Sequence, residues 1–482
     1  MNDAQSRLRE IPQVSALLED QRLCALLAGR RRFWLLGVIQ KELAGLRVRL
    51  PRETGAIRDR GQLLNEVVEA VEAEYDEMIA PAWTRVLNAT GVVVHTNLGR
   101  SNLPAVAAEA VRAVAQGNSD LEFDLAAGSR GHRGRRVEAK AAVLTGAEDA
   151  LVVNNNAAAL WLAVRHLASG GRVIISRGEV VAIGGSFRIH EILAETGCEL
   201  VEVGTTNRTT CDDYAAAMIP GAVLLKVHRS NFEMTGFIAE TTLSELVALA
   251  RETDGRVIYD AGSGALYPMA DLGLPGGETE LHQDVAVGCD LVTCSGDKLL
   301  GGCQAGIIMG SAATIAALRK HPMRRAFRVD KMTLAALDAV LGLYLEAEDL
   351  PAIPTLRMLA ATTAELEERA GILLRELEPL APAGWRGAVV PAEGSVGGGA
   401  FSSARIASRL VLWTAPKVEL EKCHRLLRTG DPALVGRMGQ DGLGVDLRTL
   451  SAEELPLVVT TFQRAWNLLT TGDQQLGGSE TR

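Results

Sequence analysis

The sequence lacks three features that would place the protein in a membrane, outside the cell or around a structural metal. Its apolar runs, such as residues 150–153 and 222–225, are short and end at polar or turn residues, so no transmembrane span is expected. Residues 1–7 lack the apolar core of a signal peptide. The seven cysteines show no Cys-x-x-Cys spacing, which argues against a zinc site and a secreted disulfide framework. These absences predict a cytoplasmic protein without a bound metal.

The composition is that of a soluble globular protein of two or three domains. The 482 residues are 47% hydrophobic and 23% charged, enough to bury a large core. A formal net charge of −9 argues against a surface covered by nucleic acid. The first 60 residues, however, hold twelve Lys or Arg against seven Asp or Glu. This local excess indicates a nucleic-acid contact, although a helical bundle with solvated arginines explains it equally well.

The hydrophobic pattern changes along the chain. Residues 15–45 carry apolar side chains at helical spacing, Pro51 and Gly55 interrupt the pattern, and residues 60–80 resume it as a Glu-rich helix. From Trp83, short β-branched runs alternate with longer helical stretches, which predicts a mostly parallel sheet between layers of helices. The predicted strands are 91–94, 150–153, 172–175, 199–203, 223–227, 256–259, 290–293 and 306–309.

The last part of the chain has a different texture. Residues 331–349 and 354–380 are predicted helices, and a smaller α+β segment begins at Gly387. Residues 471–482 are polar and glycine-rich, as expected of a frayed tail.

A lysine and an acid mark the chemistry of the predicted sheet. Lys298 lies in a polar loop between two apolar strands, and Asp260 ends a buried strand upstream. Enzymes of pyridoxal 5'-phosphate (PLP) need a lysine to hold the aldehyde and an acid to keep the pyridine nitrogen protonated. The hydroxyl of Ser295 can reach the cofactor phosphate. Solvated lysines and turn-forming Asp residues are common, but the order and strand pattern of these residues favour PLP.

Two further loops follow predicted strands and should meet at the same edge of the sheet. Asn156 and Ala157 begin an apolar helix, where backbone N–H groups can cradle the cofactor phosphate. An Asn N-cap without a ligand explains that pattern equally well. Ser230 and Asn231 stand just past another strand, where they can face the cofactor ring. The nearby His228 is interpreted as a turn or core residue.

Several arginines suggest an anionic second substrate. Arg100 is followed much later by Arg324, Arg325 and Arg328. If Pro322 opens a helix, Arg325 and Arg328 share one face of it. Guanidinium groups match phosphate oxyanions well, although a solvated helix face is the simpler interpretation of these residues taken alone.

At this point the sequence resembles a known family, the bacterial L-seryl-tRNA(Sec) selenium transferases or selenocysteine synthases, which are fold-type-I PLP enzymes. The Asn-Ala-Thr-Gly block at 88–91 and the Arg-Val-Asp-Lys block at 328–331 are specific to it, and the resemblance covers nearly the whole chain. The matching segments are 11–18, 85–100, 121–125, 154–159, 178–189, 295–302, 327–337 and 353–359.

The resemblance implies an α/β fold, the aspartate-aminotransferase-like fold of type I PLP-dependent transferases, with a mostly parallel central sheet. A small helical N-terminal domain and an α+β C-terminal domain flank it. The expected divisions are a tRNA-binding domain at 1–65, a helical linker at 66–84, the PLP-binding catalytic domain at 85–345, the C-terminal domain at 346–470 and a flexible tail at 471–482.

The resemblance also implies the reaction. The enzyme is expected to convert L-seryl-tRNA(Sec) to L-selenocysteinyl-tRNA(Sec), by β-elimination of the seryl hydroxyl to a dehydroalanyl-tRNA and addition of selenium from selenophosphate. Lys298 resembles the PLP lysine and Asp260 the partner of the pyridine nitrogen, while Arg100, Arg325 and Arg328 resemble a selenophosphate-binding cluster. A homodecamer, built as a pentamer of dimers, is expected to bind the tRNA through its basic N-terminal helices.

Two alternatives differ in what they lack. A paralogous PLP-dependent lyase acting on a small amino acid or a sugar acid would lack the N-terminal tRNA-binding part, and residues 1–80 argue against it. A tRNA-binding scaffold would have lost catalysis, and the presence of both Asp260 and Lys298 argues against that.

Overall fold

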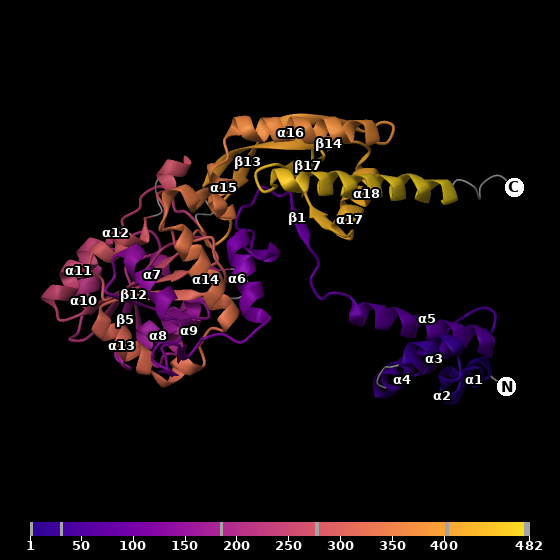
Figure 1. Cartoon of the computed structure of the whole chain (residues 1–482), viewed down its shortest axis with the longest axis horizontal. Coiled ribbons are helices and arrows are strands. Elements are labelled where there is room, and N and C mark those ends of the chain that lie inside the picture. The colour runs from indigo at the N-terminus through magenta and orange to yellow at the C-terminus, as the bar shows by residue number, and fades with distance from the viewer. Residues whose placement is uncertain (1–2, 29–31, 184–186, 275–278, 401–403, 477–482) are drawn as a thin grey trace. The chain divides into compact units, whose positions relative to one another are not determined.

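The protein divides into two compact units, residues 1–84 and 85–482 (Figure 1). The computed structural model describes residues 3–28, 32–183, 187–274, 279–400 and 404–476. Among these residues no helix is long and apolar enough to cross a membrane.

The N-terminal unit is helical. Asp59 and Gln62 form a capping box that starts its last helix, α5, and that helix packs against α4 through a shared apolar core. The predicted division at 65/66 lies inside α5, whose Val67, Val68 and Val71 belong to this core. The helices are α1 (Asp3–Arg9), α2 (Val14–Leu18), α3 (Gln21–Leu27), α4 (Arg32–Arg49) and α5 (Arg60–Ile79).

The second unit is built on a seven-stranded sheet of order β4-β12-β11-β10-β9-β5-β8. All neighbours are parallel except β12, which is antiparallel to β4 and β11. The predicted mostly parallel sheet is therefore confirmed. Its strands are β4 (Asp149–Val153), β5 (Arg172–Ser176), β8 (Glu199–Val203), β9 (Val223–Val227), β10 (Arg256–Gly262), β11 (Leu291–Ser295) and β12 (Gly306–Gly310).

Helices cover both faces of this sheet (Figure 1). Side chains alternate along a strand, so Leu151 and Val153 of β4 pack in the core with α8 (Asn156–Ala168), whereas Ala150 and Val152 pack on the opposite face with α7 (Arg135–Thr145). On the first face lies also α13 (Ala312–Lys320), and on the second lie α6 (Ala105–Ala115) and α14 (Lys331–Leu343).

The C-terminal part adds a four-stranded antiparallel sheet packed against helices. Its core contains Trp385, Trp413, Phe462 and Trp466, whose rings contact one another edge to face or tilted. The strands are β13 (Arg386–Ser395), β14 (Arg405–Thr414), β16 (Arg437–Met438) and β17 (Leu443–Asp446), and the helices are α16 (Thr363–Leu377), α17 (Lys417–Arg428) and α18 (Leu455–Leu476).

Three helix and tail predictions need adjustment here. The predicted helix 331–349 ends at Leu343, and the predicted helix 354–380 is divided into α15 (Pro354–Ala360) and α16 because the chain turns at Ala361 and Thr362 caps the second helix. Residues 471–476 of the predicted tail continue α18. Residues 477–482 lie outside the described part, as do residues 184–186 of the motif at 178–189.

The predicted strand 91–94 is wrong. The strand before it, β1 (Val86–Asn88), pairs with β15 (Ala433–Val435) in the C-terminal part, and only Val92 forms an isolated bridge, with Ser395. The reason is Gly91, whose φ of +70° turns the chain out of the extended conformation.

The Asn-Ala-Thr-Gly motif at 88–91 packs against the buried carboxylate of Asp446. Asp446 is fully buried, accepts a hydrogen bond from Ser408 Oγ at 2.6 Å and pairs with Arg437 at 2.9 Å. Arg437 also donates to the carbonyl oxygen of Thr90. A Cβ on Gly91 would overlap the side chains of Asp446 and Arg437. The motif is therefore the joint at which the start of the second unit meets its C-terminal part.

We expect Gly91→Ala to lower the free energy of unfolding by about 3 kcal/mol or more, because it adds left-handed backbone strain and disturbs a buried ion pair. Gly128→Ala is the matched control, since Gly128 has a φ of +62° but no atom within 4 Å of a built Cβ. The control should lose only the strain, about 1–2 kcal/mol. Equal losses in chemical denaturation would contradict the role of the joint.

Candidate active site

One cavity lies at the carboxyl ends of β4, β9, β10 and β11, where ligands of such sheets bind. Its volume is about 290 Å³, and we call it the strand-end cavity. The lining residues are Arg100, Asn155, Asn156, Ala157, Val181, Ile189, Val227, His228, Ser230, Asp260, Gly262, Ser295, Lys298 and Gln304.

Lys298 reaches this cavity from the loop after β11 and is only 5% exposed. Its carbonyl oxygen accepts hydrogen bonds from Ser101 Oγ at 2.6 Å and from the Gly301 N–H at 2.9 Å. The next residue, Leu299, donates its N–H to the Ser263 carbonyl oxygen at 3.0 Å. The backbone around the lysine is thus fixed while its side chain faces the cavity.

The carboxylate of Asp260 accepts hydrogen bonds from three different elements: the start of α8, the end of β10 and the neighbouring strand β11. Its Oδ1 accepts hydrogen bonds from Asn156 Nδ2 at 2.7 Å, the Gly262 N–H at 3.1 Å and Thr293 Oγ1 at 3.4 Å. Burial raises the pKa of Asp260 above its ordinary value, and these hydrogen bonds and the charge of Lys298 oppose the shift. A buried acid in this setting is well placed to balance a cation.

The amino end of α8 forms another wall of the cavity. Asn155 caps the helix by accepting a hydrogen bond from the Ala158 N–H at 2.9 Å, so the first-turn residues Asn156 and Ala157 face the cavity. A helix N-terminus offers free N–H groups and a positive dipole end to an anion. The buried Oδ1 of Asn156 has no hydrogen-bond partner within the described structure. A phosphate-bearing heterocycle would fit these donors and this acceptor.

Arg100 lines the cavity in an unusual conformation. Its φ of 64° lies in the left-handed region, at a cost of about 1–3 kcal/mol for a side chain of this size. The backbone N–H of Arg100 donates to His95 O at 3.0 Å, and its Nη1 pairs with Asp297 at 2.7 Å. The ion pair to the residue before Lys298 holds the guanidinium at the site.

The structure thus brings seven of the predicted site residues to one cavity: Lys298, Asp260, Ser295, Asn156, Ala157, Ser230 and Arg100.

Three predicted site residues do not line the cavity of the described chain. Asn231 instead donates from Nδ2 to the Ala182 carbonyl oxygen at 2.6 Å. Arg325 is exposed, and Arg328 pairs with Glu122 at 3.1 Å.

The helix predicted to begin at Pro322 is shorter than expected. It is a 3-10 helix that ends at Arg325, because the Phe327 carbonyl oxygen accepts a hydrogen bond from the Asn154 N–H at 3.0 Å instead of continuing the helix. Arg325 and Arg328 therefore share no helical face.

Sequence reasoning missed three polar residues of the cavity, Asn155, His228 and Gln304. His228 follows β9 directly, and its N–H donates to the Asp260 carbonyl oxygen at 2.9 Å. Its position just past a strand was the available signal. Gln304 gave no such signal, because it precedes β12, and only the antiparallel pairing of β12 with β4 and β11 brings it to the cavity.

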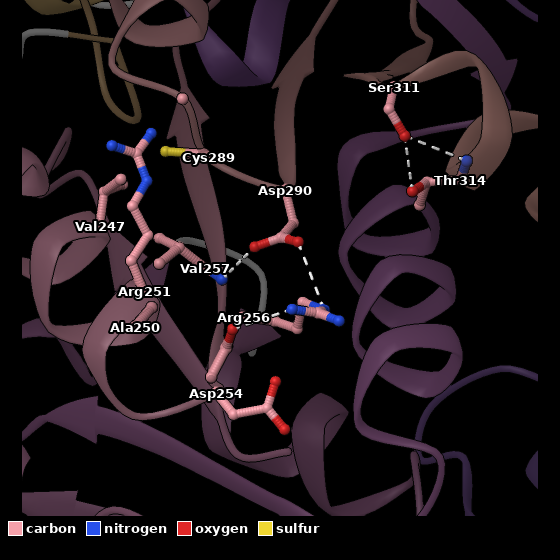
Figure 2. Close-up of a pocket in the computed structure, with 12 residues that line it drawn as sticks. Val247, Ala250, Arg251, Asp254, Arg256, Val257, Cys289, Asp290, Ser311 and Thr314 are labelled. Atoms are coloured by element: carbon pink, nitrogen blue, oxygen red, sulfur yellow. Dashed lines mark hydrogen bonds and ion pairs between the residues drawn. The ribbon is translucent and has the colours of Figure 1, made fainter. Parts of the chain in front are cut away.

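A second cavity, of about 320 Å³, lies at the amino ends of the strands, where β10 and β11 begin (Figure 2). Asp290 lines this cavity. Its carboxylate accepts a hydrogen bond from the Val257 N–H at 2.8 Å and forms an ion pair with Arg256 at 3.5 Å. Arg251 and Asp254 also line it, but no lysine does. The strand-end cavity is therefore the better candidate for an active site.

The sheet topology and the strand-end cavity together define the class of protein: a PLP-dependent enzyme of fold type I. A solved structure of D-glucosaminate-6-phosphate ammonia-lyase shares the fold, with a TM-score of 0.57 and 20% identity over 82% of this chain and 99% of that one. This likeness confirms the predicted fold class.

The particular family follows from the sequence relatives. The family described as L-seryl-tRNA selenium transferase matches residues 86–451. The chain is 43% identical to the L-seryl-tRNA(Sec) selenium transferase of Geobacter sulfurreducens, over 94% of this chain and 98% of the relative. It is 46% identical to that of Solidesulfovibrio magneticus, over 96% and 98%. The chain belongs to the L-seryl-tRNA selenium transferase family, which is PLP-dependent, so the predicted family, enzyme class and cofactor are confirmed.

The pKa of Asp260 leads to a prediction for the cofactor-free protein. A carboxyl with a raised native pKa contributes stability at low pH that is lost as the pH rises, and the hydrogen bond from Asn156 offsets part of that loss. Asn156→Ala should therefore cost about 1–3 kcal/mol when Asp260 is ionised and less when it is protonated.

Asn155→Ala is the matched control for this experiment. It removes a cap hydrogen bond to a backbone N–H and should cost about 0.5–2 kcal/mol at every pH. Denaturation of both variants across the acid range checks the difference, and parallel pH profiles would contradict it.

Proposed function

We propose that the protein converts L-seryl-tRNA(Sec) to L-selenocysteinyl-tRNA(Sec) with selenophosphate as the selenium donor. The observation that carries the proposal is the convergence of Lys298 and Asp260 in the strand-end cavity of a chain that is 43% identical to a named L-seryl-tRNA(Sec) selenium transferase. Cytoplasmic localisation is proposed with it, because the substrate is a tRNA.

The residues of the cavity fit the cofactor in a defined way. Lys298 is proposed to bond the PLP aldehyde and Asp260 to stand against the pyridine nitrogen. Asn156 and Ala157 are proposed to hold the phosphate through the α8 N-terminus, with the hydroxyl of Ser295.

Ser230 and Asn231 are proposed to stand beside the cofactor ring. Ser230 is supported by its place in the cavity wall. Asn231 is supported by its sequence position alone, one residue further along the same loop.

Lys298 has a second role in this proposal. When bound, PLP supplies an electron sink for the carbanion at the seryl α-carbon. The freed amine of Lys298 removes the α-proton as a general base. The ionised Asp260 favours the electron-poor form of the heterocycle. The β-hydroxyl would then leave as water, which gives a dehydroalanyl-tRNA. The selenium of selenophosphate would bond to the β-carbon, water would cleave its bond to phosphorus with release of phosphate, and the α-carbon would regain a proton.

The second substrate and the tRNA are proposed to use basic groups. Arg100, Arg325 and Arg328 are assigned to selenophosphate, since charged, oriented donors stabilise a phosphate that leaves during the reaction. Arg100 supports this assignment because it lines the strand-end cavity. The basic helices of the N-terminal unit are assigned to the tRNA. A homodecamer, a pentamer of dimers, is the proposed assembly.

The direct test uses the full-length protein with seryl-tRNA(Sec), seryl-tRNA(Ser) and selenophosphate. Mass analysis of the aminoacyl group should show selenocysteine on tRNA(Sec) only. Release of a product from a free sugar acid without any change in the aminoacyl group would instead favour a lyase. Native mass measurement tests the decamer separately.

Lys298→Ala should lose the covalently held cofactor and its visible absorbance, because no other cavity residue carries an amine in the described chain. Borohydride reduction followed by intact-protein mass measurement checks this. Lys320→Ala, at an exposed position at the end of α13, should retain the added mass. An unchanged visible spectrum in Lys298→Ala would refute the assignment.

Arg325→Ala should raise the KM for selenophosphate by about tenfold and change the KM for seryl-tRNA(Sec) little, because a charged donor to an oxyanion is lost. Steady-state kinetics with each substrate varied in turn checks this. Arg405→Ala removes an exposed charge from the C-terminal sheet and should change neither value. Equal effects of Arg325→Ala on both substrates would count against the assignment.

A further inference from the structure

The loop between α13 and α14 runs along β4, the edge strand of the large sheet. At its start, Arg319 donates to the Ala150 carbonyl oxygen at 2.7 Å. Near its end, the Phe327 carbonyl oxygen accepts the Asn154 N–H at 3.0 Å. These two contacts hold the loop beside β4, although none of its residues is among those that line the strand-end cavity.

Most arginines around this loop already have acid partners. Arg319 pairs with Glu138 at 2.9 Å and with Asp149. On the other side, Glu122 accepts hydrogen bonds from three guanidinium groups at 2.9 to 3.1 Å. These three groups belong to Arg130, Arg133 and Arg328. The hydrogen bond from Arg133 lowers the pKa of Glu122 most, and burial opposes this shift.

Arg324 differs from these neighbours. Its side chain is partly buried, and its Nε is buried without a hydrogen-bond partner, as are the Nε atoms of Arg133 and Arg319. No hydrogen bond or ion pair of its guanidinium is found within the described ranges. Arg325 also has no acid partner there but is exposed, so water solvates it. Of the arginines around this loop in the described ranges, only Arg324 combines partial burial with the lack of an acid partner.

The surroundings make this charge costly. Burial lowers the pKa of Arg324, and the charge of Glu138 opposes the shift. Glu138 is itself buried and bonded to Arg319, so it cannot also neutralise Arg324 fully. Three further guanidinium groups add to the lowering: Arg319, Arg328 and Arg133.

We propose that Arg324 binds a small phosphate-type oxyanion that enters the loop beside Arg325 and Arg328. An anion there would supply the counter-charge that the protein omits and would satisfy the unpaired Nε. A guanidinium offers a planar fork of donors that matches two oxygens of such an anion. Glu122 holds Arg328 in place but leaves Arg324 open for the ligand.

The identification of this anion with selenophosphate rests on the proposed function. In that case Arg324, rather than the exposed Arg325 alone, sets the affinity for the selenium donor. The oxyanion site itself stands on the contacts around Arg324 and can be tested without turnover.

The test uses the full-length protein and two probes, inorganic phosphate and thiophosphate, in calorimetric titrations. Arg324→Gln should weaken the binding of both probes about tenfold or more, because one charge-assisted pair is lost. Arg324→Lys should give an intermediate loss, since it keeps the charge and loses the fork, and it also replaces the Gln variant if that variant does not fold.

Arg130→Gln is the matched control. It removes the same charge from the same cluster, but Arg130 is 80% exposed and already paired with Glu122. Its effect on phosphate binding should be less than about twofold. Unchanged phosphate binding in Arg324→Gln, or an equal loss in Arg130→Gln, would overturn the proposal.

Two other measurements separate competing partners of Arg324. A smaller native mass of Arg324→Gln would show that a carboxylate of another copy is the counter-charge, and weaker binding of seryl-tRNA(Sec) with unchanged phosphate affinity would show an RNA phosphodiester. Either result overturns the proposal. If wild-type protein binds phosphate through Arg324 but forms no selenocysteinyl-tRNA, the oxyanion site stands and the proposed function fails.

Discussion

The burial of Asp260 and Lys298 in one cavity is the constraint on which the catalytic unit depends. Both side chains are less than a tenth exposed, and buried charges are tolerated only with partners and hydrogen bonds. The partners come from different elements: Asn156 from the start of α8, Thr293 from β11 and Gly262 from the end of β10. The sheet must therefore hold these strand ends in register, and the apolar cores on its two faces supply the rigidity.

A second buried carboxylate, Asp446, helps to fix the chain segment that leads to the strand-end cavity. The chain enters the catalytic unit through β1, turns at Gly91 over Asp446 and continues to Arg100. There the Arg100 guanidinium forms an ion pair with Asp297, the residue before Lys298. The C-terminal part is thus connected to the motif at 88–91 by the hydrogen bond from Arg437 to the Thr90 carbonyl oxygen, and Arg100 to the lysine loop by its ion pair with Asp297. The position of Arg100 therefore depends on packing far from it in the sequence.

The arginine-rich loop beside β4 shows how a protein can keep one charge available. Four acids, Glu122, Glu138, Asp149 and Asp297, are occupied by arginines around the cavity and the loop. These ion pairs fix the loop and the neighbouring residues 122–133, while the partial burial of Arg324 limits its solvation by water. The proposed anion site would result from an uneven distribution of counter-charges, since a positive charge left unpaired in a partly dry setting favours an anionic ligand.

The sequence by itself determined the alternation of strands and helices, the polar residues at strand ends and the family, because periodicity and short motifs are local properties. Lys298, Asp260 and the α8 N-terminus could be recognised in this way, each from its place just after a strand.

Only the tertiary structure decided that 91–94 is no strand, that Gln304 reaches the cavity and that Asn231 turns away from it. It also decided which partly buried arginine of the loop lacks an acid partner, since the counter-charges come from Asp149 of β4, Glu138 of α7 and Glu122. Such contacts join residues far apart in the chain, and no local pattern encodes them.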